Sequence, residues 1–202
     1  MNKDTNTRSW PWYKAWMAAL IHPDDDTWNL VLSEGNISFK RAYIWLIFTS
    51  VLFPLAYSIV VWLKSPLSIN SSNGLTFIRN IVLIGIFEPI LFVVLTGIAH
   101  FIARLFSKTG NYSNFFVVFV ASYAPISLLY AVTALVRLFV AFKIGSYAGI
   151  LLVVYFVAFI LTLIINFNYH VNLLIALVIS VGVAVLAYYS GIAIFAMTGV
   201  GI

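Results

Sequence analysis

Residues 147–165 read YAGILLVVYFVAFILTLII, an apolar run without a single charged side chain. A run of this length can cross a bilayer as one α-helix, because about 20 residues span a hydrocarbon core of about 30 Å. Four further long apolar runs occupy residues 42–63, 81–103, 115–140 and 171–196, and two of them contain one charged residue each. The sequence therefore predicts an all-α fold, a polytopic membrane bundle of five transmembrane helices.

The composition of the whole chain points to the same class of protein. Of the 202 residues, 63% are hydrophobic and 8% are charged, whereas soluble proteins have about half and about a quarter. Cysteine is absent, which excludes disulfides, thiolate metal sites and cysteine nucleophiles. The sequence contains no basic run with interleaved aromatic residues, the pattern that would indicate nucleic-acid binding. We expect the lipid bilayer as a partner, no nucleic acid and no cofactor.

Basic residues are distributed unevenly between the two sides of the predicted bundle. The larger group precedes the first span or follows the second, and consists of Lys3, Arg8, Lys14, Lys40, Arg41, Arg104 and Lys108. Lys64, Arg79 and Lys143 fall on the other side, and Arg137 lies near that end within a span. The positive-inside rule then predicts a multi-pass protein of the cell (cytoplasmic) membrane, with its N-terminus in the cytoplasm and its C-terminus outside.

Residues 1–38 are predicted to form a cytoplasmic leader, and residues 39–202 the transmembrane domain. Trp10, Trp12 and Trp16 are expected to anchor the leader at the membrane interface. Apolar side chains recur there at three- and four-residue steps, as in a helix that lies in the headgroup plane. They are Tyr13, Trp16, Met17, Leu20 and Ile21. The leader is therefore predicted to contain a short amphipathic interfacial helix.

Capping residues predict where the helices of the leader begin and end. Pro23 disfavours helical backbone at His22, so the first helix should end there. The carboxylates of residues 24–26 are expected to cap a second short helix through Leu32, which Gly35-Asn36 then breaks. Ser38 is a suitable cap for the first span.

Glu88 is the only acidic residue inside an apolar run. An ionisable group at that depth is costly unless it is paired or neutralised. Arg137, on an antiparallel neighbour, can reach a similar depth, so an intramembrane ion pair is geometrically reasonable. We favour a structural pair, or a protonated and hydrogen-bonded Glu88, over a role in transport or a contact with lipid or a partner.

A second group of polar side chains gathers at the predicted cytoplasmic end. His100 and Arg104 lie one turn apart on the second span, and Asn166, Asn168 and His170 occupy the tight connection between the last two spans. Two interpretations remain open for this polar cluster. Its side chains either satisfy helix ends and reach the headgroups, which we favour, or form a recognition surface.

The last span carries a stripe of small residues along one face. This helix-packing face consists of Ala176, Ser180, Ala184, Ala187 and Gly191. Small side chains allow another helix to approach closely. We favour packing inside the bundle over packing against a second protein, although both remain open.

Short sequence landmarks follow one another in a recognisable order. They are IHPD at 21–24, TW at 27–28, Gly35, GIAHFIAR at 97–104, GNYS at 110–113, YAP at 123–125 and YH at 169–170. In these landmarks, and in its five predicted spans, the chain resembles the Yip domain family in its prokaryotic form. The resemblance implies a five-helix bundle without known catalysis. In eukaryotic members it implies a role in vesicle traffic through prenylated small GTPases, but this chain lacks their long polar leader.

The leading functional hypothesis is a non-enzymatic scaffold, organiser or accessory subunit that contacts other membrane proteins, or a second copy of itself. A small GTPase is expected as a partner only if the eukaryotic family role applies. The alternative is a small transporter or channel that uses Glu88 and Arg137. A transporter requires Glu88 to face a wet, polar cavity, whereas a scaffold allows a dry and paired Glu88. An enzyme is not expected, because no catalytic spacing is visible.

Overall fold

The computed structural model describes residues 12–34, 38–64, 71–139 and 142–198, all of them mainly helical. The elements are α1 (Trp12–Ile21), α2 (Asp25–Glu34), α3 (Phe39–Lys64), α4 (Ser71–Phe106), α5 (Tyr112–Phe139), α6 (Phe142–Val154), the π-helix η2 (Tyr155–Leu161), α7 (Thr162–Tyr169) and α8 (Leu173–Thr198). α6, η2 and α7 follow one another without a break. The prediction of an all-α fold is confirmed for the described residues.

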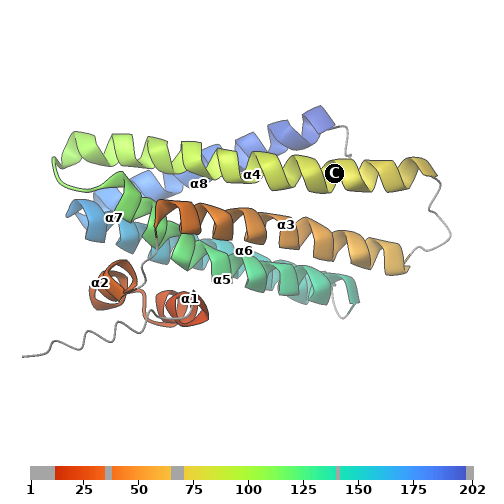
Figure 1. Cartoon of the computed structure of the whole chain (residues 1–202), viewed down its shortest axis with the longest axis horizontal. Coiled ribbons are helices and arrows are strands. Elements are labelled where there is room, and N and C mark those ends of the chain that lie inside the picture. The colour runs from red at the N-terminus through yellow and green to blue at the C-terminus, as the bar shows by residue number, and fades with distance from the viewer. Residues whose placement is uncertain (1–11, 35–37, 65–70, 140–141, 199–202) are drawn as a thin grey trace, which may run out of the picture.

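The long helices lie side by side along one axis, and the two leader helices lie across it (Figure 1). Within the described residues, four segments are long and apolar enough to cross a membrane: Gly85–Phe106, Tyr112–Thr133, Lys143–Tyr169 and Leu173–Ser190. The protein is therefore a multi-pass membrane protein by helix length and hydropathy, and it meets the bilayer through apolar helices. The predicted first span coincides with α3, which packs against α4 and α5 along the same axis (Figure 1).

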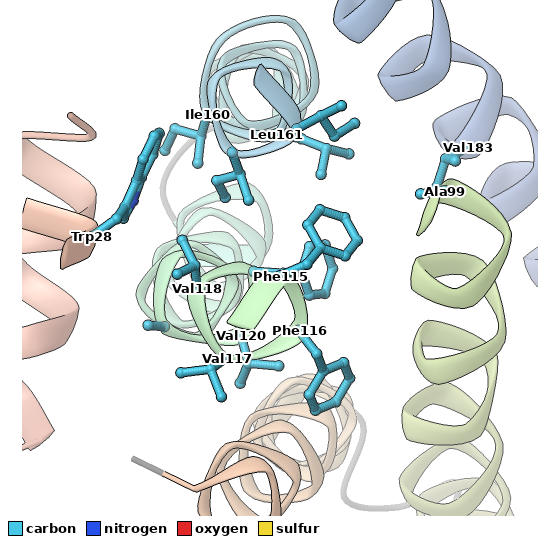
Figure 2. Packing of buried hydrophobic residues seen from close by; sticks show 14 of the residues in the cluster. Trp28, Ala99, Phe115, Phe116, Val117, Val118, Val120, Ile160, Leu161 and Val183 are labelled. Atoms are coloured by element: carbon cyan, nitrogen blue, oxygen red, sulfur yellow. The ribbon is translucent and has the colours of Figure 1, made fainter. Parts of the chain in front are cut away.

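α5 is the centre of the bundle. Of its membrane-spanning segment 67% is buried inside the protein, against 22–39% of the other three. A helix that is apolar on all sides is stable only when neighbours cover it or when lipid does. Figure 2 shows side chains of α5 pointing in several directions, with Phe116 toward α3 and Val118 toward the side on which Trp28 of α2 lies. α3, α6, α1 and α2 all contact α5.

The leader helices pack against the bundle rather than standing apart from it. Trp16 is 4% exposed, and its ring meets Trp45 of α3 edge to face at 5.5 Å. The hydroxyl of Tyr155 in η2 donates to the backbone carbonyl of Leu20 at 3.1 Å. Trp28 of α2 packs on Phe167 of α7, with ring centroids 5.3 Å apart. Both leader helices are thus held by specific aromatic contacts.

This packing corrects one part of the predicted interfacial stripe. Tyr13, Met17 and Ile21 are exposed on one face of α1, but Trp16 is buried and Leu20 is half-buried. The reason is that α1 is apolar nearly all round, so that one apolar face packs on the bundle and the other faces outward. Trp16 therefore anchors α1 to the protein and not to lipid headgroups.

Of the other predicted interfacial anchors, Trp10 and the side chain of Trp12 lie outside the described residues. They stay predictions.

The predicted helix caps of the leader are confirmed where the structure describes them. α1 ends at Ile21, directly before His22-Pro23. The Asp24 carboxylate accepts the backbone N–H of Thr27 at 2.8 Å, and this hydrogen bond lowers the pKa of Asp24. α2 then runs to Glu34 rather than Leu32, and Gly35-Asn36 lies outside the described residues.

The predicted cap of the first span is confirmed as well. At the start of α3, the Ser38 hydroxyl accepts the backbone N–H of Arg41 at 3.3 Å. α3 begins at Phe39, directly after this cap.

Candidate functional site

Two connections meet at one end of the bundle. The first joins α4 to α5 through residues 107–111, and the second joins α7 to α8 through residues 170–172. The Thr109 hydroxyl donates to the backbone carbonyl of Tyr169 at 3.0 Å, and the Asn168 amide donates to the carbonyl of Asn111 at 3.3 Å. Since these bonds join residues far apart in sequence, the two connections form one continuous surface.

Tyr169 lies beneath this surface, where the two connections meet. It is fully buried, and its hydroxyl is hydrogen-bonded to Nδ1 of His100 on α4. Its ring meets Phe115 of α5 edge to face at 5.5 Å. Gly110, at φ +100°, lies so close to the ring that a Cβ atom at this position would collide with it. One side chain thus joins α4, α5, α7 and the first connection.

The turn between α7 and α8 uses most of its polar groups internally. His170 adopts a left-handed conformation, with φ 52° and ψ 34°, and its N–H donates to the Asn166 carbonyl at 2.7 Å. The Asn166 amide donates to the carbonyl of Val171 at 2.6 Å. The carboxamide oxygen of Asn172 accepts the backbone N–H of Leu174 at 2.8 Å and so caps α8.

The members of the predicted polar cluster therefore separate into two kinds. The side chains of His100, Asn166 and Asn168 make hydrogen bonds within the protein. The side chains of Arg104 and His170 are exposed. These bonds favour the interpretation in which the cluster satisfies helix ends.

Tyr169, Thr109 and Gly110 belong to this end of the bundle but were not among the predicted site residues. The available signal was the Gly-Asn pair at 110–111, because Asn111 accepts the backbone N–H of Ser113 and caps α5. That pair indicates a turn and a cap. It does not indicate which ring packs on Gly110.

Glu88 lies on α4, half-buried, and its Oε1 accepts a hydrogen bond from the Tyr123 hydroxyl of α5 at 2.9 Å. The Tyr123 ring is in turn surrounded by aromatic rings. It stacks on Phe119 at 5.8 Å and meets Phe92 and Phe156 at 4.5 and 5.7 Å. The intramembrane acid thus has a neutral donor held by close ring packing.

The predicted partner of Glu88 lies elsewhere on the same helix as Tyr123. Arg137 is about 21 Å further along the α5 axis, at about 1.5 Å per residue. The side chain of Arg137 lies outside the described residues. The Glu88–Arg137 ion pair stays a prediction.

The small-residue face of α8 begins inside the bundle. Ala176 and Ser180 are fully buried, Ala184 and Ala187 are partly exposed, and Gly191 lies outside the residues whose environment is described. The Ser180 hydroxyl donates to the backbone carbonyl of Val157 in η2. The first half of the stripe thus serves packing within this chain.

Metal binding finds no support in the part of the chain that the structure describes. No group of three or more His, Cys, Asp or Glu side chains there is close enough to hold an ion. No family model, no curated protein and no solved structure matches this chain. Any functional conclusion therefore depends on the geometry of the chain itself.

Proposed function

We propose that this protein is a non-enzymatic membrane scaffold, organiser or accessory subunit, built on the five-helix bundle without known catalysis that the resemblance to prokaryotic Yip domain proteins implies. The observation that carries the proposal is the hydrogen bond from Tyr123 to Glu88. A transporter needs its intramembrane acid to face a hydrated path. Here the acid has a protein donor whose ring is packed among Phe92, Phe119 and Phe156.

In this proposal α3 is the fifth span. It has 26 residues, which is enough to cross about 30 Å of hydrocarbon, and it packs against α4 and α5. An odd number of spans puts the termini on opposite sides of the membrane. The basic residues before α3 and after α4 support a cytoplasmic leader, with the connections that meet at Tyr169 on the same side.

Partner contacts are expected on exposed apolar faces. The stripe of Tyr13, Met17 and Ile21 on α1 is one such face, and the exposed part of α8 is another. The partners are other membrane proteins or a second copy of the chain. A small GTPase enters only if the eukaryotic family role holds.

A transporter or channel is the second candidate, because Glu88 is an ionisable residue inside a membrane-spanning helix. The substitution Glu88→Gln distinguishes the two functions. Glutamine keeps an oxygen that accepts the Tyr123 hydrogen bond but cannot carry a proton or a charge. For a scaffold we expect Glu88→Gln to purify from membranes in mild detergent with the same stoichiometric partner as the wild type, and to show the same absence of proton flux in liposomes.

Two variants control this experiment. Asp26→Asn removes an exposed acid of α2 and should leave both measurements unchanged. Tyr123→Phe removes the donor and should cost about 1–3 kcal/mol of stability, because Glu88 loses its partner. A proton or ion flux that is present in the wild type and lost in folded Glu88→Gln would sink the scaffold proposal. A monodisperse monomer without any partner would also contradict it.

A further inference from the structure

α4 and α8 leave an apolar groove between them, beside the end of the bundle where the two connections meet. Its volume is about 650 Å³, within the range of about 300–1,000 Å³ that is typical of ligand sites. α4 contributes Ile102 and Phe106, and α8 contributes a stripe from Leu174 to Leu186. All of the lining residues are apolar. The groove therefore selects a ligand by shape and hydrophobicity alone along this stretch.

The α8 side of the groove is about as long as one leaflet of a bilayer, while the α4 side, from Ile102 to Phe106, covers about one helical turn. α8 rises about 18 Å from Leu174 to Leu186, which slightly exceeds half of a hydrocarbon core of about 30 Å. Leu174 lies in the first turn of α8. The groove thus begins where α8 enters the membrane and continues to about its midplane.

A basic residue follows the α4 side of the groove. Lys108 lies two residues after Phe106 and is exposed. Residues 99–111 and 166–198 contain no acidic residue. The acidic residues 24–26 belong to the leader segment around α2, which lies on the opposite side of the bundle from α4 and α8 (Figure 1). An anionic group at the mouth therefore meets Lys108 and no opposing carboxylate of these segments.

We propose that this groove binds one acyl chain of an anionic phospholipid, with the lipid phosphate beside Lys108. A helix from a partner protein is the competing occupant. An apolar membrane-spanning helix offers no anionic group to Lys108, whereas an anionic lipid brings a phosphate to Lys108 while one acyl chain follows the apolar groove. An anionic lipid is therefore the better match. This inference does not depend on the proposed scaffold function, because the exposed stripe on α1 remains available to a partner when lipid occupies the groove beside α8.

Gly182 offers a direct test, since it lines the groove and a Cβ atom added there meets nothing within 4 Å. Gly182→Leu should fill the groove without disturbing the fold. Gly97→Leu is the matched control, because Gly97 on α4 is equally open and does not line the groove. The probe is a phosphatidylglycerol with a photoreactive diazirine on one acyl chain, incorporated with the protein into phosphatidylcholine liposomes.

After illumination and peptide mapping, we expect the label to concentrate on residues 174–186 and 102–106. It should fall several-fold in Gly182→Leu and remain at the wild-type level in Gly97→Leu. Unlabelled phosphatidylglycerol should compete better than phosphatidylcholine, and Lys108→Gln should remove this preference. If Gly182→Leu does not fold, Val178→Phe provides a second way to fill the groove from an exposed position of α8.

Two outcomes would overturn the proposal. In the first, the label spreads evenly over exposed apolar positions such as Ile150 and Leu151 of α6, and the groove variants have no effect. Lipid then surrounds the protein without a defined site. In the second, the groove is protected from the lipid probe by a protein that copurifies with the chain.

Discussion

At the scale of single residues, the contacts of Tyr169 explain the identity of the residues around it. A side chain at position 110 would collide with its ring, and the φ of +100° at this position also favours glycine. Both facts explain why residue 110 is a glycine. The Tyr169 hydroxyl meets His100, and its backbone carbonyl meets Thr109. A substitution of Tyr169 should therefore disturb the packing of two connections and three helices.

We therefore expect Tyr169→Phe to destabilise the protein by about 1–2 kcal/mol, because His100 loses its partner while the ring stays in place. For a chain of this size the melting temperature should fall by about 2–4 °C per kcal/mol. Thermal unfolding in detergent measures this change in melting temperature. Tyr188→Phe is the control, since Tyr188 is 67% exposed and no hydrogen bond of its hydroxyl is present in the described structure. Equal melting temperatures for Tyr169→Phe and the wild type would contradict the importance of this hydroxyl.

At the scale of elements, η2 is a π-helical segment inside a span that was predicted as a plain α-helix. A π-helix shifts the backbone hydrogen bonds by one residue and changes which carbonyls need a partner. The carbonyl of Val157 accepts two hydroxyls, from Thr162 at 3.1 Å in the same span and from Ser180 of α8. This carbonyl couples the π-helix to the packing of α8.

Because either hydroxyl can satisfy the carbonyl, Thr162→Val and Ser180→Ala should each cost less than about 1 kcal/mol. The double variant leaves a buried carbonyl without a side-chain donor and should cost about 1–3 kcal/mol beyond the sum of the two. A double-mutant cycle from thermal or denaturant unfolding measures the coupling. Strict additivity would show that the two hydroxyls act independently. Ser127→Ala provides a control, since its buried hydroxyl donates to Ala124 within α5 and lies outside this pair.

At the scale of the whole molecule, α5 is surrounded by the other helices, while α4, α6 and α8 expose long apolar faces. Such faces are tolerated in lipid, where they need no polar cover. The number of crossings decides how the two ends of the chain are placed. Five crossings separate the leader from the end of α8, whereas four leave them on the same side.

Because the sequence contains no cysteine, single introduced cysteines can report on which side of the membrane each end of the chain lies. We expect Asn29→Cys, on the exposed side of α2, to react with a membrane-impermeant maleimide only after the cells are opened. Thr198→Cys, at the end of α8, should react in intact cells. Lys108→Cys and Lys143→Cys serve as the inner and outer controls. Reaction of Asn29→Cys and Thr198→Cys from the same side would show that α3 does not cross.

Sequence patterns predicted the helices better than the contacts between them. The stop at His22-Pro23 and the cap at Ser38 depend on near neighbours in the chain, and both are confirmed. Trp16 was placed at the headgroups because the apolar pattern of α1 does not say which face packs on protein. The sequence allows a hydrogen-bonded Glu88 but does not identify Tyr123 as the donor, because this contact joins two helices.

The sequence by itself determined that this chain is helical and meets lipid, because long apolar runs and helix caps act over one turn or one bilayer thickness. Only the tertiary structure decided that α5 is central, that Trp16 turns inward and that Tyr169 joins two connections. It also decided that α4 and α8 leave a groove. The physical reason is that several faces of these helices are apolar, so the choice among them depends on which neighbours pack closely, and that choice involves residues far apart in sequence.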